Sequence, residues 1–338
     1  MGRLLLIAAL VAVAAAVTCA AAGAATGPGA RPAQADAPEV VFVTTDCTPA
    51  SFLCNGFKQA VRRTGARGRV VAPDAREDIA GTLSLLARQG NDLVIVDFSY
   101  APQLAIAARR NPTARFALLD APFALVDGAP RNVAAVVIRV NEAAYLAGWL
   151  GARMERTRRG PDVVGVVGGE PIPPVQDFVL GYRAGARAAS PGSRVITGFS
   201  LDFADPARCA TVARRQIARG AGVVFDVAGG CGPGTLAAAK AAGVWAIGVD
   251  EDRLGLGPHI LTSVVKRYDR EIALLIRGVR DGTLGFGRTT VLGLRNGGAE
   301  LGRISPRVPA RIRAELAAVR RRVVSGAIRV PGITLPRP

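Results

Sequence analysis

The chain has 338 residues with a hydrophobic content of 50%, and its 43 lysines and arginines against 26 aspartates and glutamates give a net charge of +17. This content is sufficient for a large core, and the length favours more than one domain. Aromatic residues make up only 5% of the chain, and no zinc-finger spacing or RNA-binding motif accompanies the arginines, so we expect no nucleic-acid partner. We interpret the charge as a solvated surface that suits an acidic membrane or cell wall.

The N-terminus has the layout of a secretory signal peptide. A positive start, MGR, precedes a continuous apolar run at residues 4–17, and small residues follow. The run is too short and too poorly flanked for a stable membrane span, and no later stretch predicts a membrane helix. Cys19 follows small residues, as in a bacterial lipoprotein signal, so it is a candidate for lipidation, with simple cleavage as the alternative. We expect residues 1–38 to be a signal peptide and flexible tether, and the protein to be exported to the cell surface or periplasm.

Export leaves the four remaining cysteines in an oxidising setting, where three pairings are possible. We predict a Cys47–Cys54 disulfide, which closes a short local loop. We also predict Cys209–Cys231, which joins the start of one helix to the glycine turn of the next unit. Metal binding is the alternative, but the sequence has no CxxC motif and a single histidine, so we expect no metal site.

Strands and helices alternate along the rest of the chain, which predicts parallel sheets covered on both faces. In the first half, the predicted strands are 40–45, 69–71, 93–96, 115–120 and 133–138, and the predicted helices are 57–64, 79–89 and 102–110. In the second half, the predicted strands are 163–167, 194–199, 223–228, 244–249, 260–266 and 289–294, and the predicted helices are 141–156, 176–189, 206–219, 235–242, 268–281 and 309–324.

This pattern predicts an α/β fold of two doubly wound lobes, with a small ligand between them. The expected boundaries are 39–140 plus 264–290 for the N-terminal lobe, 141–263 plus 291–308 for the C-terminal lobe, and 309–338 for a C-terminal helix and tail. We expect hinge crossings near Arg139–Asn141, near Ser263–Lys266 and near the last strand.

The stretch Val223–Asp250 predicts a strand, a glycine turn, a helix and a second strand. Its glycines at 229, 230, 232 and 234 let the backbone turn sharply and approach a ligand. The second strand delivers Asp250 to its carboxyl end, and ligands of open α/β sheets bind outside such ends. The turn and Asp250 should therefore face the same crevice, unless the glycines serve only the turns that any such unit needs.

Several segments together resemble the basic membrane protein family, the substrate-binding lipoproteins of ABC transporters, whose best-known members bind nucleosides. The segments are FALLD with NVAAVVIRVNEAAYLAGWLGA, VVGVVGGEPIPPVQDFVLGYRAGA, VVFDVAGGCGPGTLAAAKAAGVWAIGVDED, LTSVVKRYD and VVSGAIRVP. They cover most of the chain from Val94 to Pro331 in the family's order. The resemblance implies the two-lobed periplasmic-binding protein type I fold.

The resemblance also implies how a nucleoside would be held at its ribose. Asp250 and Lys266 match the family's ribose-binding positions, and a carboxylate with an ammonium suits the two hydroxyls of a vicinal diol. The backbone N–H groups of Gly229 and Gly230 are candidates to contact the 5′-hydroxyl.

For the base, the resemblance implies a ring at Phe178 for stacking and a carboxylate at Asp120 for reading a polar edge. Asp46, Ser51 and Phe52 resemble parts of the family's Asp-Asp-x-Ser-Phe-Asn segment, so we include Asp46 and Phe52 as binding candidates. The chain departs from the family here, because Phe52 sits closer to the following glycine and two cysteines flank the loop.

The resemblance therefore implies an extracytoplasmic substrate-binding protein of an ABC transporter. We expect a monomer that needs no cofactor, binds a small nucleoside-like ligand, with a purine nucleoside favoured, and delivers it to a membrane permease. A secreted ligand sensor of the same fold is the alternative. An enzyme is disfavoured, because the sequence has no P-loop GK[ST], no GxSxG and one histidine. A hydrolase would have to use carboxylates at strand ends, such as Asp46, Asp97, Asp120 and Asp250.

Overall fold

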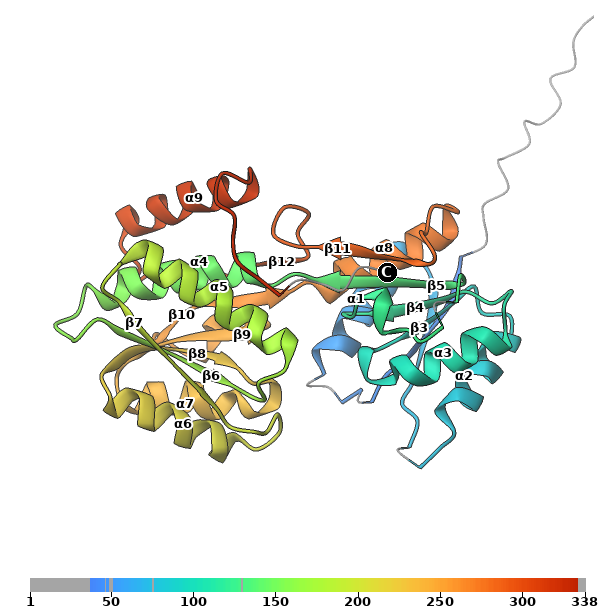
Figure 1. Ribbon diagram of the computed structural model, residues 1–338, viewed down its shortest axis with the longest axis horizontal. Helices are drawn as coiled ribbons and strands as arrows, with labels where there is room; N and C mark the ends of the chain where they lie inside the picture. Colours follow the sequence, from blue (N-terminus) through green and yellow to red (C-terminus); the bar gives the residue numbers. More distant parts are fainter. Residues whose placement is uncertain (1–36, 46, 49–50, 75, 129, 334–338) are drawn as a thin grey trace, which may run out of the picture. The chain divides into compact units, whose positions relative to one another are not determined.

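The computed structural model describes residues 37–45, 47–48, 51–74, 76–128 and 130–333. The predicted signal peptide, the lipidation candidate Cys19 and the binding candidate Asp46 lie outside the described residues. Within the described ranges, strands and helices alternate and form two six-stranded sheets (Figure 1).

The first sheet has the strand order β11-β5-β4-β3-β1-β2, and all of its pairings are parallel. Its strands are β1 Glu39–Val43, β2 Arg67–Val71, β3 Leu93–Val96, β4 Phe116–Leu119, β5 Val133–Ile138 and β11 Arg288–Leu292. The second sheet has the order β12-β10-β9-β8-β6-β7 and is parallel except where β12 runs antiparallel to β10. Its strands are β6 Val163–Gly168, β7 Arg194–Phe199, β8 Ala221–Val227, β9 Trp245–Asp250, β10 Ile260–Lys266 and β12 Ala299–Leu301.

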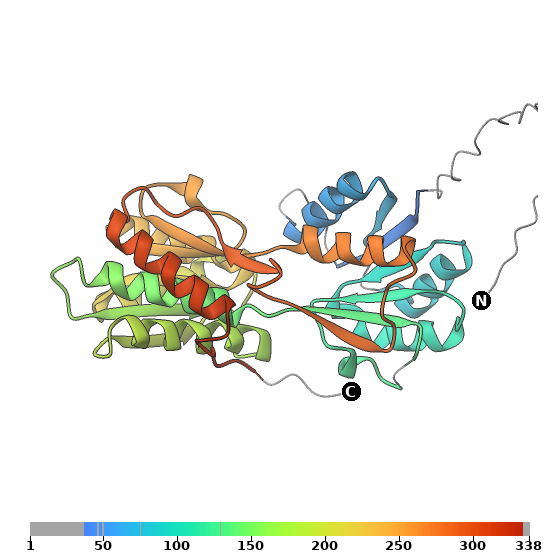
Figure 2. The same cartoon turned by 90° about the horizontal axis from the view of Figure 1, so that it is seen from above.

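Helices cover both faces of each sheet. The helices are α1 Phe52–Thr64, α2 Ile79–Arg88, α3 Ala101–Arg110, α4 Asn141–Glu155, α5 Pro173–Ala189, α6 Pro206–Ala218, α7 Pro233–Ala241, α8 Tyr268–Arg280 and α9 Ala310–Val324. On the first sheet, α1 packs beside α8 on one face (Figure 2) and α2 beside α3 on the other; on the second sheet, α4 pairs with α5 and α6 with α7. The predicted doubly wound α/β fold is therefore confirmed. None of the helices in the described part of the chain is both long enough and apolar enough to span a bilayer.

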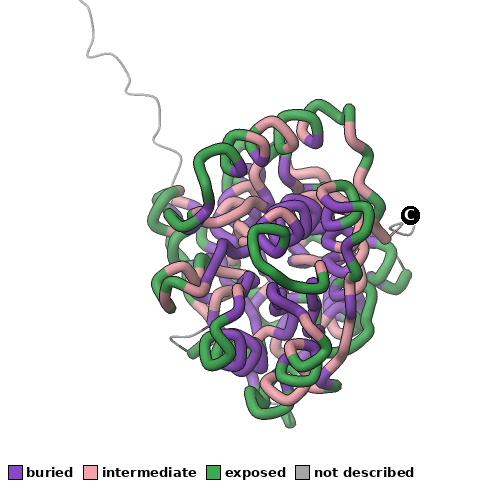
Figure 3. The backbone as a smooth tube through the Cα atoms, turned by 90° about the vertical axis from the view of Figure 1, so that its left-hand side faces the viewer, coloured by how far each residue is buried: buried purple, intermediate pink, exposed green. Residues whose placement is uncertain are grey.

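The central strands are buried on both faces, which explains their unbroken apolar sequences. β4, with the sequence FALL, and β8, with AGVVFDV, are buried at every position, as expected for parallel strands between two helix layers. Figure 3 shows buried stretches of the backbone in the interior and exposed stretches around them. Side chains at the carboxyl ends of these strands therefore extend from a buried scaffold.

The first helix begins earlier than the sequence predicted. We expected the segment before Phe57 to be a loop, but α1 starts at Phe52 because Ser51 caps it, accepting a hydrogen bond from the backbone N–H of Cys54 at 3.4 Å. Gly65, with φ of 70°, ends the helix in the left-handed conformation. The extra turn carries Phe52 and Asn55 to the start of a helix rather than a loop.

The chain passes between the two sheets three times within the described residues. It leaves β5 for α4 near Arg139, leaves β10 for α8 at Arg267, and leaves β11 for β12 through residues 293–298. Two of the expected lobe boundaries need correction by this sheet membership. β10 continues to Lys266 in the second sheet because it pairs with β9, and β11 continues to Leu292 in the first sheet because it pairs with β5.

Both predicted disulfides are present, Cys47–Cys54 and Cys209–Cys231. The first ties the segment after β1 to the first turn of α1. The second ties α6 to the turn after β8, with a Cα–Cα distance of 5.7 Å. Each disulfide therefore fixes a loop at the carboxyl end of a strand.

Removing the Cys209–Cys231 disulfide by the double replacement Cys209→Ala and Cys231→Ala is expected to lower the free energy of unfolding by about 3 kcal/mol, as chain-entropy estimates give for a loop of this size. Urea unfolding of the oxidised protein measures the loss. The corresponding pair of replacements at Cys47 and Cys54 is the control, with a smaller loss of about 2 kcal/mol because that loop spans a separation of only 7 residues. A larger loss for the short loop would contradict the entropic account.

Candidate functional site

A cleft of about 610 Å³ lies where α1 faces the carboxyl ends of β9 and β10. From the first lobe, α1 contributes Phe52, Asn55, Gly56 and Gln59 to its lining. The opposite side is formed by the β9 end and its following turn, the β10–α8 connection, and β12 with the residues after it. Of the expected binding residues in the described part of the chain, this cleft brings together Phe52, Asp250 and Lys266.

Asp250 and Lys266 are neighbours because their strands are neighbours. β9 and β10 run parallel, with Val265 opposite Asp250, so both strands deliver an ionisable side chain to the same edge. Asp250 has φ of 66°, a left-handed conformation that aspartate adopts more readily than most residues. No described residue donates a hydrogen bond to its carboxylate. Burial raises the pKa of Asp250, and the Lys266 ammonium counteracts part of this rise.

Lys266 is held from the side away from the cleft. Its ammonium donates to Asp120 Oδ2 at 2.5 Å, and both side chains are only 9% exposed. The ammonium also lies over the rings of Phe178 and Tyr268, 5.8 Å and 5.6 Å from their centroids. Burial lowers the pKa of Lys266, but the Asp120 and Asp250 carboxylates outweigh it and leave the pKa above its usual value. The ammonium is therefore charged and fixed in direction.

Asp120 has a different setting from the one expected of a residue that reads a base. It directly follows β4, does not line the cleft, and accepts hydrogen bonds from Lys266 and from the Tyr268 hydroxyl at 2.8 Å on the same oxygen. With its carboxylate already occupied, Asp120 is suited to anchor Lys266.

Phe178 also differs from the expectation. Its side chain is 4% exposed and packs edge-on against Phe225 at a centroid distance of 6.1 Å. The ring therefore supports the Lys266 ammonium from within the core and has no free face for stacking. Phe52 does line the cleft, where it stacks on Tyr268 with a centroid distance of 5.6 Å and an interplanar angle of 26°.

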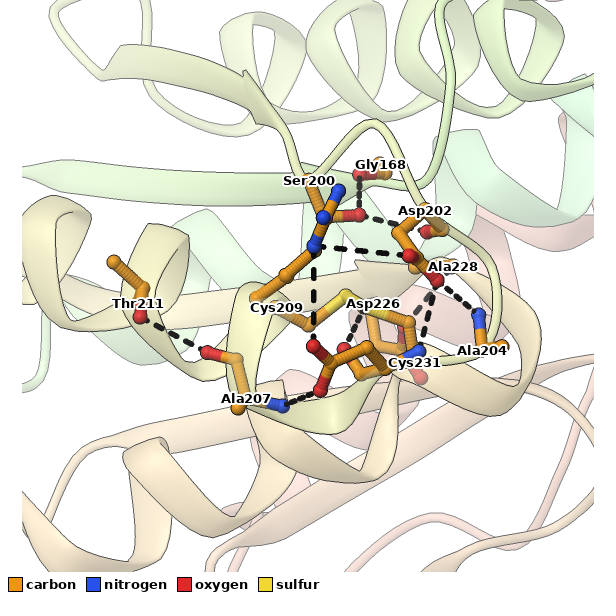
Figure 4. The surroundings of a disulfide bond; sticks show 12 residues. Gly168, Ser200, Asp202, Ala204, Ala207, Cys209, Thr211, Asp226, Ala228 and Cys231 are labelled. Atoms are coloured by element: carbon orange, nitrogen blue, oxygen red, sulfur yellow. Dashed lines mark hydrogen bonds and ion pairs between the residues drawn. A yellow bond between two sulfur atoms is a disulfide. The ribbon is translucent and has the colours of Figure 1, made fainter.

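The glycine turn lies at the carboxyl end of β8 but outside the cleft lining. Gly229 has φ of 54° and is half-buried, and Gly230 is exposed. The loop after β7 folds over this turn and is pinned to it where Cys231 N–H donates to the Phe203 carbonyl at 2.9 Å. Figure 4 shows that loop, with Ser200, Asp202 and Ala204, beside the Cys209–Cys231 disulfide.

Two aromatic residues of this region were missed in the sequence. Phe203 is 38% exposed, and its ring lies so close to Gly169 that a Cβ there would be 2.3 Å from it. The signal available was its place in SLDFADP, directly after a strand of the second lobe. Tyr268 follows Lys266 by two residues, and its ring and hydroxyl join Phe52 to Asp120.

A buried carboxyl group underlies the glycine turn. Asp226 is 3% exposed, and its Oδ1 accepts from Ala228 N–H at 3.0 Å. Gly232 has to be glycine, since a Cβ there would lie 2.0 Å from Asp226 Oδ2. Burial, and then repulsion by Asp250, raise the pKa of Asp226 to about 8. The group is therefore protonated in the folded protein at neutral pH.

Because the pKa of Asp226 is raised in the folded protein, the free energy of unfolding should fall as the pH rises. The stability that the Asp226 proton contributes is fully present below the ordinary pKa of 3.8 and is lost as the pH rises to about 8, by up to about 1.4 kcal/mol per pH unit. Asp226→Asn keeps the acceptor for Ala228 and abolishes the titration. We expect the variant to be more stable than the wild type at pH 7–8, and urea unfolding at several pH values measures this. The matched control is Asp127→Asn, whose side chain is 89% exposed; equal pH dependence in wild type and Asp226→Asn would contradict the buried acid.

Known proteins resemble this chain in sequence and in fold. The model of the family Bmp, described as ABC transporter substrate-binding protein PnrA-like, matches residues 50–334. An ABC transporter nucleoside-binding protein from Lactococcus lactis is 29% identical over 263 residues, which cover 72% of each chain.

Solved structures share the fold. An ABC transporter solute-binding protein from Conexibacter woesei has a TM-score of 0.68 and 25% identity, with 88% of this chain and 99% of that chain covered. One from Aeropyrum pernix has a TM-score of 0.74 and 22% identity, with 87% of this chain and 94% of that chain covered, and supports the fold alone.

Proposed function

Since the chain belongs to the family of PnrA-like ABC transporter substrate-binding proteins, we propose that it binds a purine nucleoside beside Asp250 and Lys266. The protein acts outside the cytoplasm and delivers this ligand to a membrane permease. Substrate-binding proteins of this kind hold a ligand without changing it, so no residue is assigned a catalytic role and no cofactor is required.

The observation that carries the proposal is the pairing of Asp250 and Lys266 at the cleft. Asp250 presents a carboxylate that no described side chain or backbone N–H occupies, and Lys266 presents an ammonium fixed by Asp120. A carboxylate accepts and an ammonium donates, so the pair matches the two hydroxyls of a ribose, each of which does both. The Asp250 carboxyl group is half-buried, and burial raises its pKa, so hydrogen bonds from a diol would relieve part of the cost of its charge.

Partly exposed aromatic rings, one in this cleft and one at the glycine turn outside its lining, support a flat ligand. Phe52 lines the same cleft, with one face covered by Tyr268. Phe203 is partly exposed above the glycine turn of the second lobe. Stacking on such rings favours a base over a plain sugar. The Lactococcus lactis relative is named for nucleoside binding, which agrees with this choice of ligand.

A thermal-shift screen tests the proposal. The mature protein is heated with adenosine, guanosine, inosine, free purine bases, ribose and other sugars. A nucleoside present at a hundredfold excess over its dissociation constant is expected to stabilise the protein by about 2.7 kcal/mol. If a sugar stabilises the protein and no nucleoside does, the protein is still a substrate-binding protein, but its ligand is not a purine nucleoside. Turnover of a ligand would reject the binding class itself.

Replacing Phe52 with leucine is expected to weaken nucleoside binding about tenfold, because base–aromatic stacking contributes about 1–3 kcal/mol. Binding of ribose alone should not change. Titration calorimetry on both ligands separates the two effects. The control is Phe98→Leu, a ring that is 50% exposed in the first lobe and outside the cleft lining. An equal loss for nucleoside and ribose would show that Phe52 shapes the cleft without stacking on the base.

A further inference from the structure

We propose that Glu271 is a positioning residue of the ligand site, which holds Asp120 so that the Asp120 carboxylate keeps the Lys266 ammonium at the cleft. The inference rests on the proposed function, because it takes Lys266 as a ligand-binding group. It assigns a role to a buried acid of α8 that does not itself line the cleft.

Asp120 needs to be held because its backbone is strained. Its φ of 53° is in the left-handed region, directly after the last residue of β4, and a non-glycine residue persists there only when its surroundings fix it. The backbone N–H of Asp120 donates to Glu271 Oε1 at 3.0 Å. This hydrogen bond joins the carboxyl end of β4 to the first turn of α8, and so fixes the direction in which the Asp120 side chain leaves the strand.

Glu271 is an unexpected residue at its position. Its side chain is completely buried, and its Oε2 has no hydrogen-bond partner among the described residues. The next buried positions of α8, such as Ile272 and Leu275, are apolar, and a leucine at 271 would fill the same space without the cost of burying an acid. Burial, and then repulsion by Asp120, raise the pKa of Glu271 well above its usual value. The one hydrogen bond of this carboxyl group among the described residues is the one that its Oε1 accepts from the Asp120 N–H.

The contacts continue from Asp120 to the cleft. Asp120 Oδ2 accepts from Lys266 Nζ at 2.5 Å and from the Tyr268 hydroxyl at 2.8 Å. Lys266 ends β10, and Tyr268 and Glu271 lie in the first turn of α8, so the three residues belong to one short segment around the crossing at Arg267. Asp120 is therefore held twice by this segment. Glu271 accepts a hydrogen bond from its backbone N–H, and Lys266 and Tyr268 donate hydrogen bonds to its carboxylate. A change at Glu271 should reach the ligand only through Asp120 and Lys266.

The experiment compares wild type with Glu271→Gln, Glu271→Leu and Asp120→Asn. Both changes at 271 remove the acid, but only glutamine keeps the acceptor for Asp120 N–H. The first readout needs no ligand: the chain has three lysines, Lys58, Lys240 and Lys266, so the Lys266 side chain can be titrated by carbon-13 NMR. The second readout is the affinity for the nucleoside that stabilises the wild type best.

Glu271→Gln is expected to match the wild type in both readouts. Glu271→Leu is expected to resemble Asp120→Asn, with the pKa of Lys266 lowered because the Asp120 carboxylate no longer supports the ammonium, and with nucleoside affinity reduced about tenfold. Adding Asp120→Asn to Glu271→Leu should cause little further loss, since one residue acts through the other. A folded Glu271→Leu protein with unchanged Lys266 titration would overturn the inference, as would an equal loss in Glu271→Gln.

Two outcomes need separate treatment: a Glu271→Leu variant that does not fold, and a wild type that binds no nucleoside. If circular dichroism shows that Glu271→Leu does not fold, amide exchange of Asp120 in the wild type and in Glu271→Gln replaces it. Slow exchange in both is expected, and fast exchange in the folded wild type would overturn the inference. If no nucleoside binds the wild type while the Lys266 titrations follow the expected order, the proposed ligand fails and the positioning role of Glu271 stands.

Discussion

Asp250→Asn is expected to weaken nucleoside binding by at least about 100-fold without lowering the stability of the free protein. The carboxylate would accept two hydrogen bonds from the ribose diol, and hydrogen bonds to charged groups contribute about 1.5–3 kcal/mol each. Asparagine has only one acceptor oxygen. It also tolerates the left-handed backbone at this position, with φ of 66°, where alanine would be strained. Because burial raises the pKa of Asp250, removing the charge relieves a cost in the ligand-free state. Titration calorimetry and thermal unfolding measure the two effects.

A matched control for this variant is Asp162→Asn. Asp162 also has a left-handed backbone, with φ of 55°, and its side chain accepts from the Ser190 hydroxyl at 2.6 Å. It directly precedes β6 and so lies at the amino end of a strand, whereas the cleft lies at the carboxyl ends of β9 and β10. Nucleoside affinity should be unchanged in this variant. If both replacements weaken binding equally, the loss at Asp250 comes from the backbone and the ribose assignment is wrong.

Lys266→Met is expected to abolish measurable binding and to lower the free energy of unfolding by about 3 kcal/mol. Methionine keeps the length of the side chain and removes its charge, so Asp120 is left as a buried carboxylate with no counter-ion. Breaking a buried ion pair by removing one partner typically costs about 3–5 kcal/mol, and both side chains here are only 9% exposed. Urea unfolding at neutral pH measures the loss of stability.

The double variant Lys266→Met with Asp120→Asn separates the two consequences. The second replacement removes the unpaired charge, so most of the lost stability should return. Binding should not return, because the ammonium that contacts the ligand is still absent. Recovery of binding in the double variant would show that Lys266 only neutralises Asp120 and takes no part in holding the ligand.

The sequence predicted best the positions of residues that are set by strand ends, while their role in binding stays a prediction. Asp250 and Lys266 each end an apolar run, and the carboxyl ends of parallel strands meet at one edge of a sheet. If the two strands are neighbours in a parallel sheet, their carboxyl ends lie side by side. The two side chains are then close together whatever the rest of the fold. The cysteine pairs were also predictable, because the two cysteines of each pair are close in the sequence, 7 and 22 residues apart.

The aromatic residues were harder to place, since their positions depend on irregular segments. Phe203 lies in a loop whose path is fixed by hydrogen bonds of Asp202 and by the backbone of Cys231, neither of which has a periodic signature. Phe178 lies on α5 at a spacing that suits either the core or a ligand, and packing against Phe225 decides for the core. The helical start at Phe52 likewise depended on the Ser51 cap.

Glu271 shows a different limit. α8 has a strongly amphipathic sequence, in which acids are expected on the solvent side, but Glu271 lies on the buried side beside Ile272. Its partner, the backbone N–H of Asp120, is 151 residues away in the chain. The contact arises because the chain returns from β10 to the first lobe, where α8 packs against β4, and this packing has no signature in the local sequence.

The most direct test of the ribose assignment is a calorimetric titration of the mature protein with inosine and with 2′,3′-dideoxyinosine. The two ligands share the base and differ only in the diol that Asp250 and Lys266 are proposed to hold. We expect inosine to bind with a dissociation constant at or below the micromolar range and the dideoxy analogue to bind at least about 100-fold more weakly. Equal affinities for the two ligands would contradict the assignment of this cleft as a ribose site.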